Sequence, residues 1–206
     1  FLMLSNGLEA KVGTLGSKYE FFHEWKRLKE SDAGSVELET MLRGICEKKT
    51  FLDLLENFIL YDHSGGRTTK ILARNHQYLG VNEAVSAYEN RKLKDGRLGV
   101  FWHTQGSGKS YSMVFLAQKI RRKFAGSPTI VVLTDRDELN RQISDTFENC
   151  GLLGKTKASQ FIASSGTDLV KKAAGQPQLC VYPDPEVQSA QGAAYLPGSR
   201  HSDFVG

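Results

Sequence analysis

The pattern of hydrophobic and polar positions along the chain predicts four helices. Apolar residues three or four positions apart indicate buried helical faces over Ser35–Tyr61, Asn75–Lys94, Ser110–Phe124 and Asp137–Cys150. In the first of these ranges, Thr50 stands just before the apolar stripe and is a candidate helix cap. Core packing is a sufficient explanation for each stripe, so the helices by themselves indicate no function.

Two shorter apolar runs predict β-strands between the helices. Leu98–His103 precedes the third helix, and Thr129–Thr134 follows it after a glycine-proline turn. Strands that alternate with helices predict a parallel sheet with right-handed crossovers, so the expected fold class is α/β. The apolar runs are of strand length and far shorter than the roughly 20 residues of a membrane helix, so we expect no membrane span.

Changes in composition suggest how the chain is divided. The polar, glycine-rich stretch Asp62–Lys70 predicts a linker. After Gly175 four of the five prolines occur, charges become sparse, and neither helical nor strand periodicity is visible. The predicted parts are residues 1–34, a helical connector and linker at 35–70, an α/β unit at 71–175, and an irregular tail at 176–206.

Composition and charge narrow the function only slightly. The 206 residues are 40% hydrophobic and 24% charged, which is typical of a globular protein with one good core or a core and part of a second. A net charge of +4 mildly favours a polyanionic partner. The basic cluster Arg121–Lys123 ends a predicted helix, where cations also favour the helix dipole and face water. Three cysteines without a CxxC pair suggest a reducing cytoplasm and no metal site.

The chemistry is concentrated in a short loop between the first predicted strand and the third helix. Gly106 and Gly108 allow successive backbone N–H groups to approach a phosphate, and Lys109 would contact the β and γ phosphates. The Ser110 hydroxyl would bind the magnesium ion at the helix N-terminus. His103 replaces the first glycine of the usual pattern, and we interpret it as a structural residue at the strand end. The candidate nucleotide contacts in the loop are Thr104, Gln105, Gly106, Ser107, Gly108, Lys109 and Ser110.

The alternative for this loop is a chance GxGKS on the surface, although the strand before it and the helix after it argue against chance. A complete ATPase site also needs an Asp-Glu pair at the end of another core strand. Asp137 and Glu138 are adjacent carboxylates, but we interpret them as residues that begin a helix. Since no Asp-Glu pair follows Cys150, we expect this chain alone to be inactive in hydrolysis.

Three stretches resemble the restriction (R) subunit of bacterial type I restriction-modification enzymes. They are Asn75–Val85, Gly99–Met113 and Val131–Gln142, and the histidine at 103 is part of that family's own WHTQGSGKS pattern. The upstream stretch Asn6–Lys26 resembles the region where the family's nuclease domain ends. The resemblance implies that the chain begins with the C-terminal end of a nuclease domain and continues through a mostly helical segment. It is then expected to form the first part of a RecA-like motor lobe of the superfamily-two helicase type.

The resemblance also implies cofactors, partners and two further contacts. The parent subunit would be an ATP-dependent endonuclease that uses ATP and Mg²⁺ to translocate double-stranded DNA, together with methyltransferase (M) and specificity (S) subunits. Gln77 would read the adenine, or it is an ordinary surface residue. Thr134 and Arg136 would contact the DNA backbone, or Arg136 pairs with a neighbouring carboxylate. Another superfamily-two helicase, a catalytically dead nucleotide-binding fragment and an inert product remain alternatives.

The tail departs from the family's pattern. The stretch CVYPDPEVQ, at residues 180–188, stands where the family has T-x-I-Q-K-F. Codons for Tyr182–Gln188, read one base later, are compatible with Thr-Leu-Ile-Gln-Lys-Phe. We therefore hypothesise that residues from about Tyr182 to Gly206 are translated out of frame and have little reason to fold.

Overall fold

The computed structural model describes residues 1–126, 128–134, 137–153, 161–174 and 179–183. Its helices are α1 (Leu38–Ile45), α2 (Lys48–Asn57), α3 (Asn75–Glu89), α4 (Lys109–Lys123), α5 (Asp137–Asn149) and α6 (Gly166–Ala174). Its strands are β1 (Leu2–Ser5), β2 (Ala10–Gly13), β3 (Ile59–Asp62), β4 (Thr69–Leu72), β5 (Ile130–Thr134) and β6 (Leu179–Pro183). Short 3-10 turns lie at Tyr19–Phe21, Ser64–Gly66 and Arg91–Lys94.

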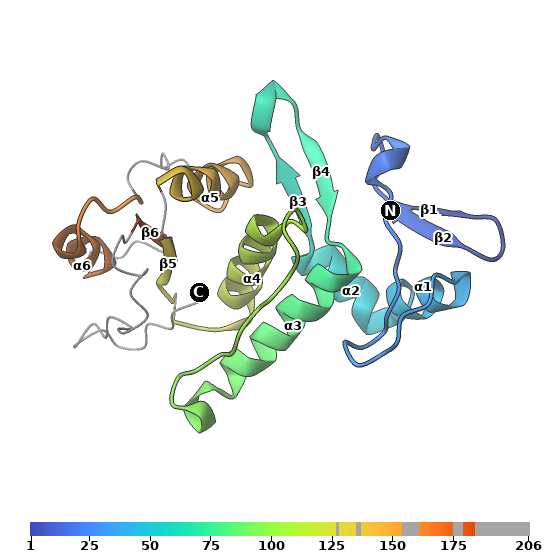
Figure 1. The fold of residues 1–206 in the computed structure, drawn as a ribbon, viewed down its shortest axis with the longest axis horizontal. Helices are drawn as coiled ribbons and strands as arrows, with labels where there is room; N and C mark the ends of the chain where they lie inside the picture. The colour runs from blue at the N-terminus through green and yellow to red at the C-terminus, as the bar shows by residue number, and fades with distance from the viewer. Residues whose placement is uncertain (127, 135–136, 154–160, 175–178, 184–206) are drawn as a thin grey trace.

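Helices α3 and α4 lie side by side in the middle of the molecule (Figure 1). The antiparallel hairpin β1–β2 and helices α1 and α2 are at one end, and the parallel pair β5–β6 with α6 is at the other. A second antiparallel hairpin, β3–β4, extends beside α4. The molecule is therefore mixed α/β with a small parallel sheet, as the alternation of elements predicts in outline.

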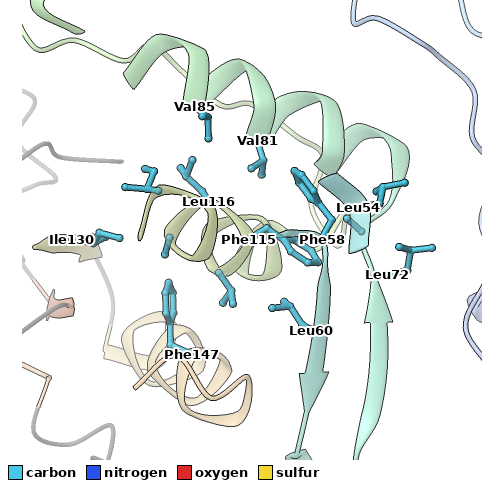
Figure 2. Close-up of a cluster of buried hydrophobic side chains, with 14 of the residues drawn as sticks. Leu54, Phe58, Leu60, Leu72, Val81, Val85, Phe115, Leu116, Ile130 and Phe147 are labelled. Atoms are coloured by element: carbon cyan, nitrogen blue, oxygen red, sulfur yellow. The ribbon is translucent and has the colours of Figure 1, made fainter. Parts of the chain in front are cut away.

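The hydrophobic core surrounds α4. Phe115 of this helix is fully buried and lies close to Phe58, which precedes β3, with ring centroids 5.6 Å apart. Figure 2 shows this cluster reaching from the β3–β4 hairpin and α3, across α4, to Phe147 of α5. Because the same cluster includes side chains on both sides of the stretch at 62–70, that stretch does not separate two cores.

A buried ion pair joins α2 to α4. The Lys119 ammonium lies 2.6 Å from each carboxylate oxygen of Asp53 and 2.6 Å from the side-chain oxygen of Asn82. Asp53 also accepts a hydrogen bond of 2.9 Å from the side-chain amide of Asn57. Burial lowers the pKa of Lys119, and the neighbouring Asp53 carboxylate opposes that change. Helix α4, in the predicted α/β unit, is thereby tied to a helix from the predicted connector.

Several predicted elements are confirmed. Helices α3, α4 and α5 and strand β5 form where the periodicity places them, with ends shifted by a few residues. Within α3, Val81, Val85 and Tyr88 are buried, as expected from their common face. Asp137 and Glu138 do form the first turn of α5.

The single helix predicted over Ser35–Tyr61 is wrong in detail. The segment forms α1 and α2 and then turns into β3, which pairs with β4. The apolar run at 58–60 fits helical and strand spacing equally well, so periodicity could not distinguish them. The cap of α2 is Glu47, whose carboxylate accepts from the backbone N–H of Thr50, so Thr50 is not the cap.

The predicted linker and mostly helical lead-in also need correction. Asp62–Lys70 is the turn end of the β3–β4 hairpin, where Gly65 and Gly66 adopt positive φ angles of 63° and 72°. Because glycines and polar residues are typical of both linkers and hairpin turns, composition alone did not separate the two. Two antiparallel hairpins therefore precede α3, whereas the division of the chain at residues 34, 70 and 175 stays a prediction.

The strand predicted at Leu98–His103 does not form. In the part of the chain that the structure describes, the backbone of residues 98–102 makes no hydrogen bond, and Val100 and Trp102 are 93% and 82% exposed. A strand needs a neighbouring strand to satisfy its backbone, and β5 pairs with β6 instead. This segment is extended chain that leads into the loop at 104–110.

The start of the predicted irregular tail is in fact a strand. β6 pairs in parallel with β5, in a register that opposes Cys180 to Val131 and Val181 to Val132. Strands buried on both faces are continuous apolar runs without alternation, so the period-2 signal was missing. Residues 184–206, where most of the proposed frameshift falls, lie outside the described residues. No helix among the described residues is long and apolar enough to cross a membrane.

Candidate functional site

The loop between the extended segment and α4 has the backbone shape that its glycines allow. Gly106 and Gly108 adopt positive φ angles of 77° and 85°, and Gly108 is the N-cap of α4. Apart from Gly106 itself and its two chain neighbours, no atom of the described structure lies within 4 Å of the position where a side chain would begin on Gly106. The loop therefore leaves open space beside its backbone at the N-terminus of a 15-residue helix.

The charged end of Lys109 lies against its own loop. Its ammonium donates to the carbonyl oxygens of His103 at 2.6 Å and Thr104 at 3.1 Å. The residue is exposed, so these bonds can be exchanged for bonds to an anion with little reorganisation. Thr104 and Gln105 are also exposed, whereas Ser107 and Ser110 are partly covered. The candidate loop residues thus lie around the open space beside Gly106.

The first turn of α3 is hydrogen-bonded to the loop. His76 Nε2 lies 3.0 Å from the Ser107 carbonyl oxygen, and Gln77 Nε2 donates to the Gly108 carbonyl at 2.9 Å. The other end of the Gln77 amide accepts from the Arg74 backbone N–H at 2.9 Å. Gln77 is only 3% exposed, so the surface-residue interpretation is wrong. Its predicted contact with adenine stays a prediction.

The start of α3 is anchored in turn to the N-terminal part of the chain. The side-chain oxygen of Asn75 accepts from the backbone N–H groups of Lys26 and Arg27, at 3.2 and 3.0 Å. The Asn75 amide nitrogen donates back to the Arg27 carbonyl at 2.9 Å. Residues before the predicted α/β unit therefore help to position the turn that contacts the loop.

Three histidines lie near this junction. The rings of His76 and His103 pack edge to face with centroids 4.7 Å apart, and His103 packs on Phe101 at 4.4 Å. Burial, followed by the nearby His76, lowers the pKa of His103. Burial, with Arg74 and His76 nearby, lowers the pKa of His23 from 6.5 to about 4. His103 is thus a packed residue at the loop entrance, consistent with the structural role expected for it.

The residue after Ser110 fixes α4 to the β3–β4 hairpin. The Tyr111 hydroxyl donates to the Asp62 carboxylate at 2.6 Å, and Asp62 also accepts from the Ser64 backbone N–H at 2.8 Å. Burial alone would raise the pKa of Asp62, but these hydrogen bonds outweigh it and lower the pKa. Burial and the Asp62 carboxylate raise the pKa of Tyr111 well above its ordinary value.

A cleft of about 480 Å³ lies next to the loop, between α3, α4 and the extended segment. Its lining is mostly apolar and includes Phe101, Trp102 and Met113. Lys109 and Glu30 bring opposite charges to it. The loop lysine thus stands at the edge of a hollow that is large enough for part of a small ligand.

Of the two predicted DNA contacts, only Thr134 lies within the residues that the structure describes. Thr134 is the last residue of β5 and is buried, at 4% exposure. Arg136 and its neighbour Asp135 lie outside the described residues. The basic cluster at the end of α4 is partly structural, because Arg121 donates to the Leu152 carbonyl at 2.9 Å and Lys123 pairs with Glu89 at 2.6 Å.

Comparison with known proteins shows which family this chain matches. A family model described as SWI2/SNF2 ATPase matches residues 76–182, just over half of the chain, and the match includes the whole loop and α3 from its second residue. The chain belongs to the SWI2/SNF2 ATPase family. An ATPase family is consistent with a glycine-rich loop that opens a helix, and ATP use is what this membership implies.

Curated relatives of this SWI2/SNF2 ATPase chain bear out the resemblance to type I restriction subunits. The type I restriction enzyme HindI endonuclease subunit of Haemophilus influenzae is 38% identical in an alignment 184 positions long that covers 85% of this chain. The "Putative type I restriction enzyme MjaIXP endonuclease subunit" of Methanocaldococcus jannaschii is 30% identical in an alignment 199 positions long that covers 84% of this chain. The matches cover only 16% and 18% of those relatives, so the chain spans less than a fifth of their length.

Sequence reasoning missed several residues that support the loop of this SWI2/SNF2 ATPase chain. His76 stands beside Gln77 in a stretch that carries the resemblance, yet no spacing rule connects it with Ser107, 31 residues later. The Asp62–Tyr111 bond spans 49 residues and had no sequence signal. Such contacts depend on tertiary packing, and only the structure reveals them.

Proposed function

We propose that this chain is the ATP-binding part of a type I restriction endonuclease subunit, whose parent translocates double-stranded DNA and cleaves it. The observation that carries the proposal is the loop at 104–110, with Gly106 and Gly108 at positive φ and Lys109 at the start of α4. Both relatives described above are named as endonuclease subunits of type I restriction enzymes, which supports the wider role.

The residues of the loop fit ATP and magnesium. The open space at Gly106 accommodates a phosphate against backbone N–H groups, and Lys109 would exchange the carbonyls of its own loop for phosphate oxygens. The Ser110 hydroxyl would bind Mg²⁺, which would neutralise charge on the phosphates. Gln77 would contact the adenine from the first turn of α3. The bound nucleotide would thereby bridge α3, the loop and α4.

The wider architecture would be the first part of a RecA-like lobe of the superfamily-two helicase type. The parallel pair β5–β6 and the unpaired extended segment at 98–103 support this, because that segment would become a strand if further strands lay beside it. Residues 1–34 would be the end of a nuclease domain. Thr134 and Arg136 would contact the DNA backbone, and M and S subunits would join the intact complex.

Nucleotide binding by the purified chain tests the proposal. Calorimetric titration with Mg²⁺-ATP should show binding to the unaltered chain, and Lys109→Ala should weaken it at least tenfold because the phosphates lose their cation. Lys123→Ala removes a lysine at the opposite end of α4 and should leave the affinity unchanged. Equal affinity for Lys109→Ala and the unaltered chain would count against a phosphate-binding loop.

Hydrolysis is expected to be absent from this chain alone, because no Asp-Glu pair follows Cys150. Phosphate release should therefore stay at background, with and without double-stranded DNA. Magnesium-dependent, DNA-stimulated release of phosphate would show that the chain carries a hydrolytic site of its own.

A further inference from the structure

Two successive carbonyl groups of the loop are held by side chains from another element. Ser107 O is within hydrogen-bond distance of His76 Nε2, and Gly108 O accepts from Gln77 Nε2, at 3.0 and 2.9 Å. Both side chains lie in the first turn of α3, 31 residues before their partners. The adjacent Asn75 is itself fixed to Arg27, so the turn that holds these carbonyls is anchored on its far side.

The direction of a carbonyl fixes the direction of the next N–H group. In a planar trans peptide the C=O and the N–H point to opposite sides. When His76 holds the Ser107 carbonyl, the N–H of Gly108 points away from α3. The Gly108 carbonyl is held jointly, because it accepts from Gln77 and from the Ser112 backbone N–H at 3.1 Å, so Gln77 and the first turn of α4 together set the direction of the Lys109 N–H. These are N–H groups of the kind that a phosphate-binding loop presents to its anion.

We propose that His76 is a positioning residue for the phosphate site, which acts with Gln77 by holding the loop carbonyls so that the loop N–H groups face the anion. The inference rests on the proposed binding of ATP and deepens it, because it assigns a role to a residue that makes no contact with the nucleotide. Donation to Ser107 requires a proton on Nε2, and the edge-to-face contact with His103 fixes the plane of the ring.

Helix stability does not explain a histidine at this place. His76 is the second residue of α3, and histidine is not a favoured residue type in helices. The preceding residues already satisfy the end of the helix, because the Arg74 backbone N–H bonds to the Gln77 side chain. The bond from His76 to Ser107 instead lowers the cost of holding the loop in one shape before a ligand arrives.

The experiment separates the phosphate contacts from the base contacts. The purified 206-residue chain is titrated calorimetrically, in Mg²⁺ buffer, with ADP and with inorganic tripolyphosphate, which has no base. His76→Phe keeps an aromatic ring against His103 but removes the donor, and His76→Gln returns a donor of similar reach. His63→Phe makes the same change at an exposed histidine in the turn of the β3–β4 hairpin, where the ring bonds to the Thr68 hydroxyl.

His76→Phe should weaken the binding of ADP and of tripolyphosphate by the same factor of about ten. In both cases the Ser107 carbonyl loses the hydrogen bond that fixes its direction. His76→Gln should recover most of the affinity, and His63→Phe should not change it. A His76→Phe chain that binds both ligands like the unaltered chain overturns the inference. A loss of affinity for ADP alone also overturns the inference, because His76 would then affect the binding of the adenosine and not of the phosphates.

Two further results keep the test decisive. If the unaltered chain binds neither ligand, the proposed ATP site itself fails, which differs from a failure of His76 alone. Folding of each variant is checked by far-UV circular dichroism and by the fluorescence of the buried Trp25. If His76→Phe does not fold, His76→Leu is titrated in its place, and unchanged affinity for tripolyphosphate in that variant likewise overturns the inference.

Discussion

Removal of Asp53 from its buried pair with Lys119 should cost more stability than removal of Lys119. The side chain of Lys119 is 8% exposed and that of Asp53 is 21% exposed. Asp53→Ala would leave the ammonium with the Asn82 oxygen at 2.6 Å and the face of the Phe58 ring at 4.9 Å. Lys119→Met would leave the carboxylate with the Asn57 amide and some water.

The magnitudes follow from this asymmetry. Removal of one partner from a buried ion pair typically costs about 3–5 kcal/mol, so Asp53→Ala should lower the free energy of unfolding by about 3 kcal/mol. Lys119→Met keeps the apolar stem and leaves a better-solvated charge, so it should cost only ~1.5 kcal/mol. The double variant buries no unpaired charge and should lose roughly 1 kcal/mol, which gives a coupling free energy of about 3.5 kcal/mol.

Urea unfolding followed by tryptophan fluorescence measures these differences. Trp102 is 82% exposed and Trp25 is 2% exposed, so a Trp102→Phe background leaves the buried Trp25 as the reporter of unfolding. The matched control is the exposed pair Glu39 and Arg43, 2.7 Å apart with side chains 66% and 68% exposed. Its double-mutant cycle should give ~0.5 kcal/mol or less.

The reasoning would be refuted if the losses from Asp53→Ala and Lys119→Met simply added in the double variant. It would also be refuted if Lys119→Met were the more damaging change, because the argument depends on the ammonium being the more deeply buried charge. A coupling no larger than that of the exposed control pair would mean that water screens the pair.

Three further predictions concern other buried groups. Burial lowers the pKa of His23 to about 4, so the unfolded chain binds this proton at a higher pH than the folded chain does. The free energy of unfolding should therefore drop by up to ~3 kcal/mol as the pH falls from 6.5 to 4. Urea titrations of His23→Gln at several pH values should lack this drop. Tyr111→Phe removes the hydroxyl bond to the buried Asp62 carboxylate, which keeps only its bond from the Ser64 backbone N–H among those described above, and should cost about 2 kcal/mol, measured by the same titrations at pH 7. Gly44→Val would force a side chain into the Trp25 indole and should cost roughly 3 kcal/mol with a shift of Trp25 emission, whereas an unshifted spectrum would show that α1 can move aside.

Hydrophobic periodicity predicted the helices that follow the loop because their buried residues recur at regular spacing. α5 buries one face, and within α4 the predicted inward positions Leu116, Ala117 and Ile120 are buried at helical intervals, although the core surrounds that helix on its other sides too. The glycine-rich loop could be placed because its chemistry requires particular residues in consecutive positions. Both signals are local, so the sequence alone was enough for them.

The remaining features depend on pairing across the chain. Leu60 and Leu72 face the core from a hairpin, but nothing near either residue indicates that Ile59 pairs with Leu72. β6 is recognised only through its pairing with β5, and no strand among the described residues pairs with the segment at 98–103 despite its strand-like sequence. Local pattern gives the preference for a strand, whereas the neighbours decide whether it forms.

The anchoring of α3 has a consequence for how this ATPase unit can be transplanted. The family match begins at residue 76, one residue after Asn75, which bonds to the chain at Lys26 and Arg27. A recombinant domain cut at that boundary would also lose Asp53, the partner of a buried lysine. The unit that carries these contacts is therefore larger than the unit that family resemblance delimits, and a chimera joined at residue 76 should be less soluble than one that keeps residues 1–75.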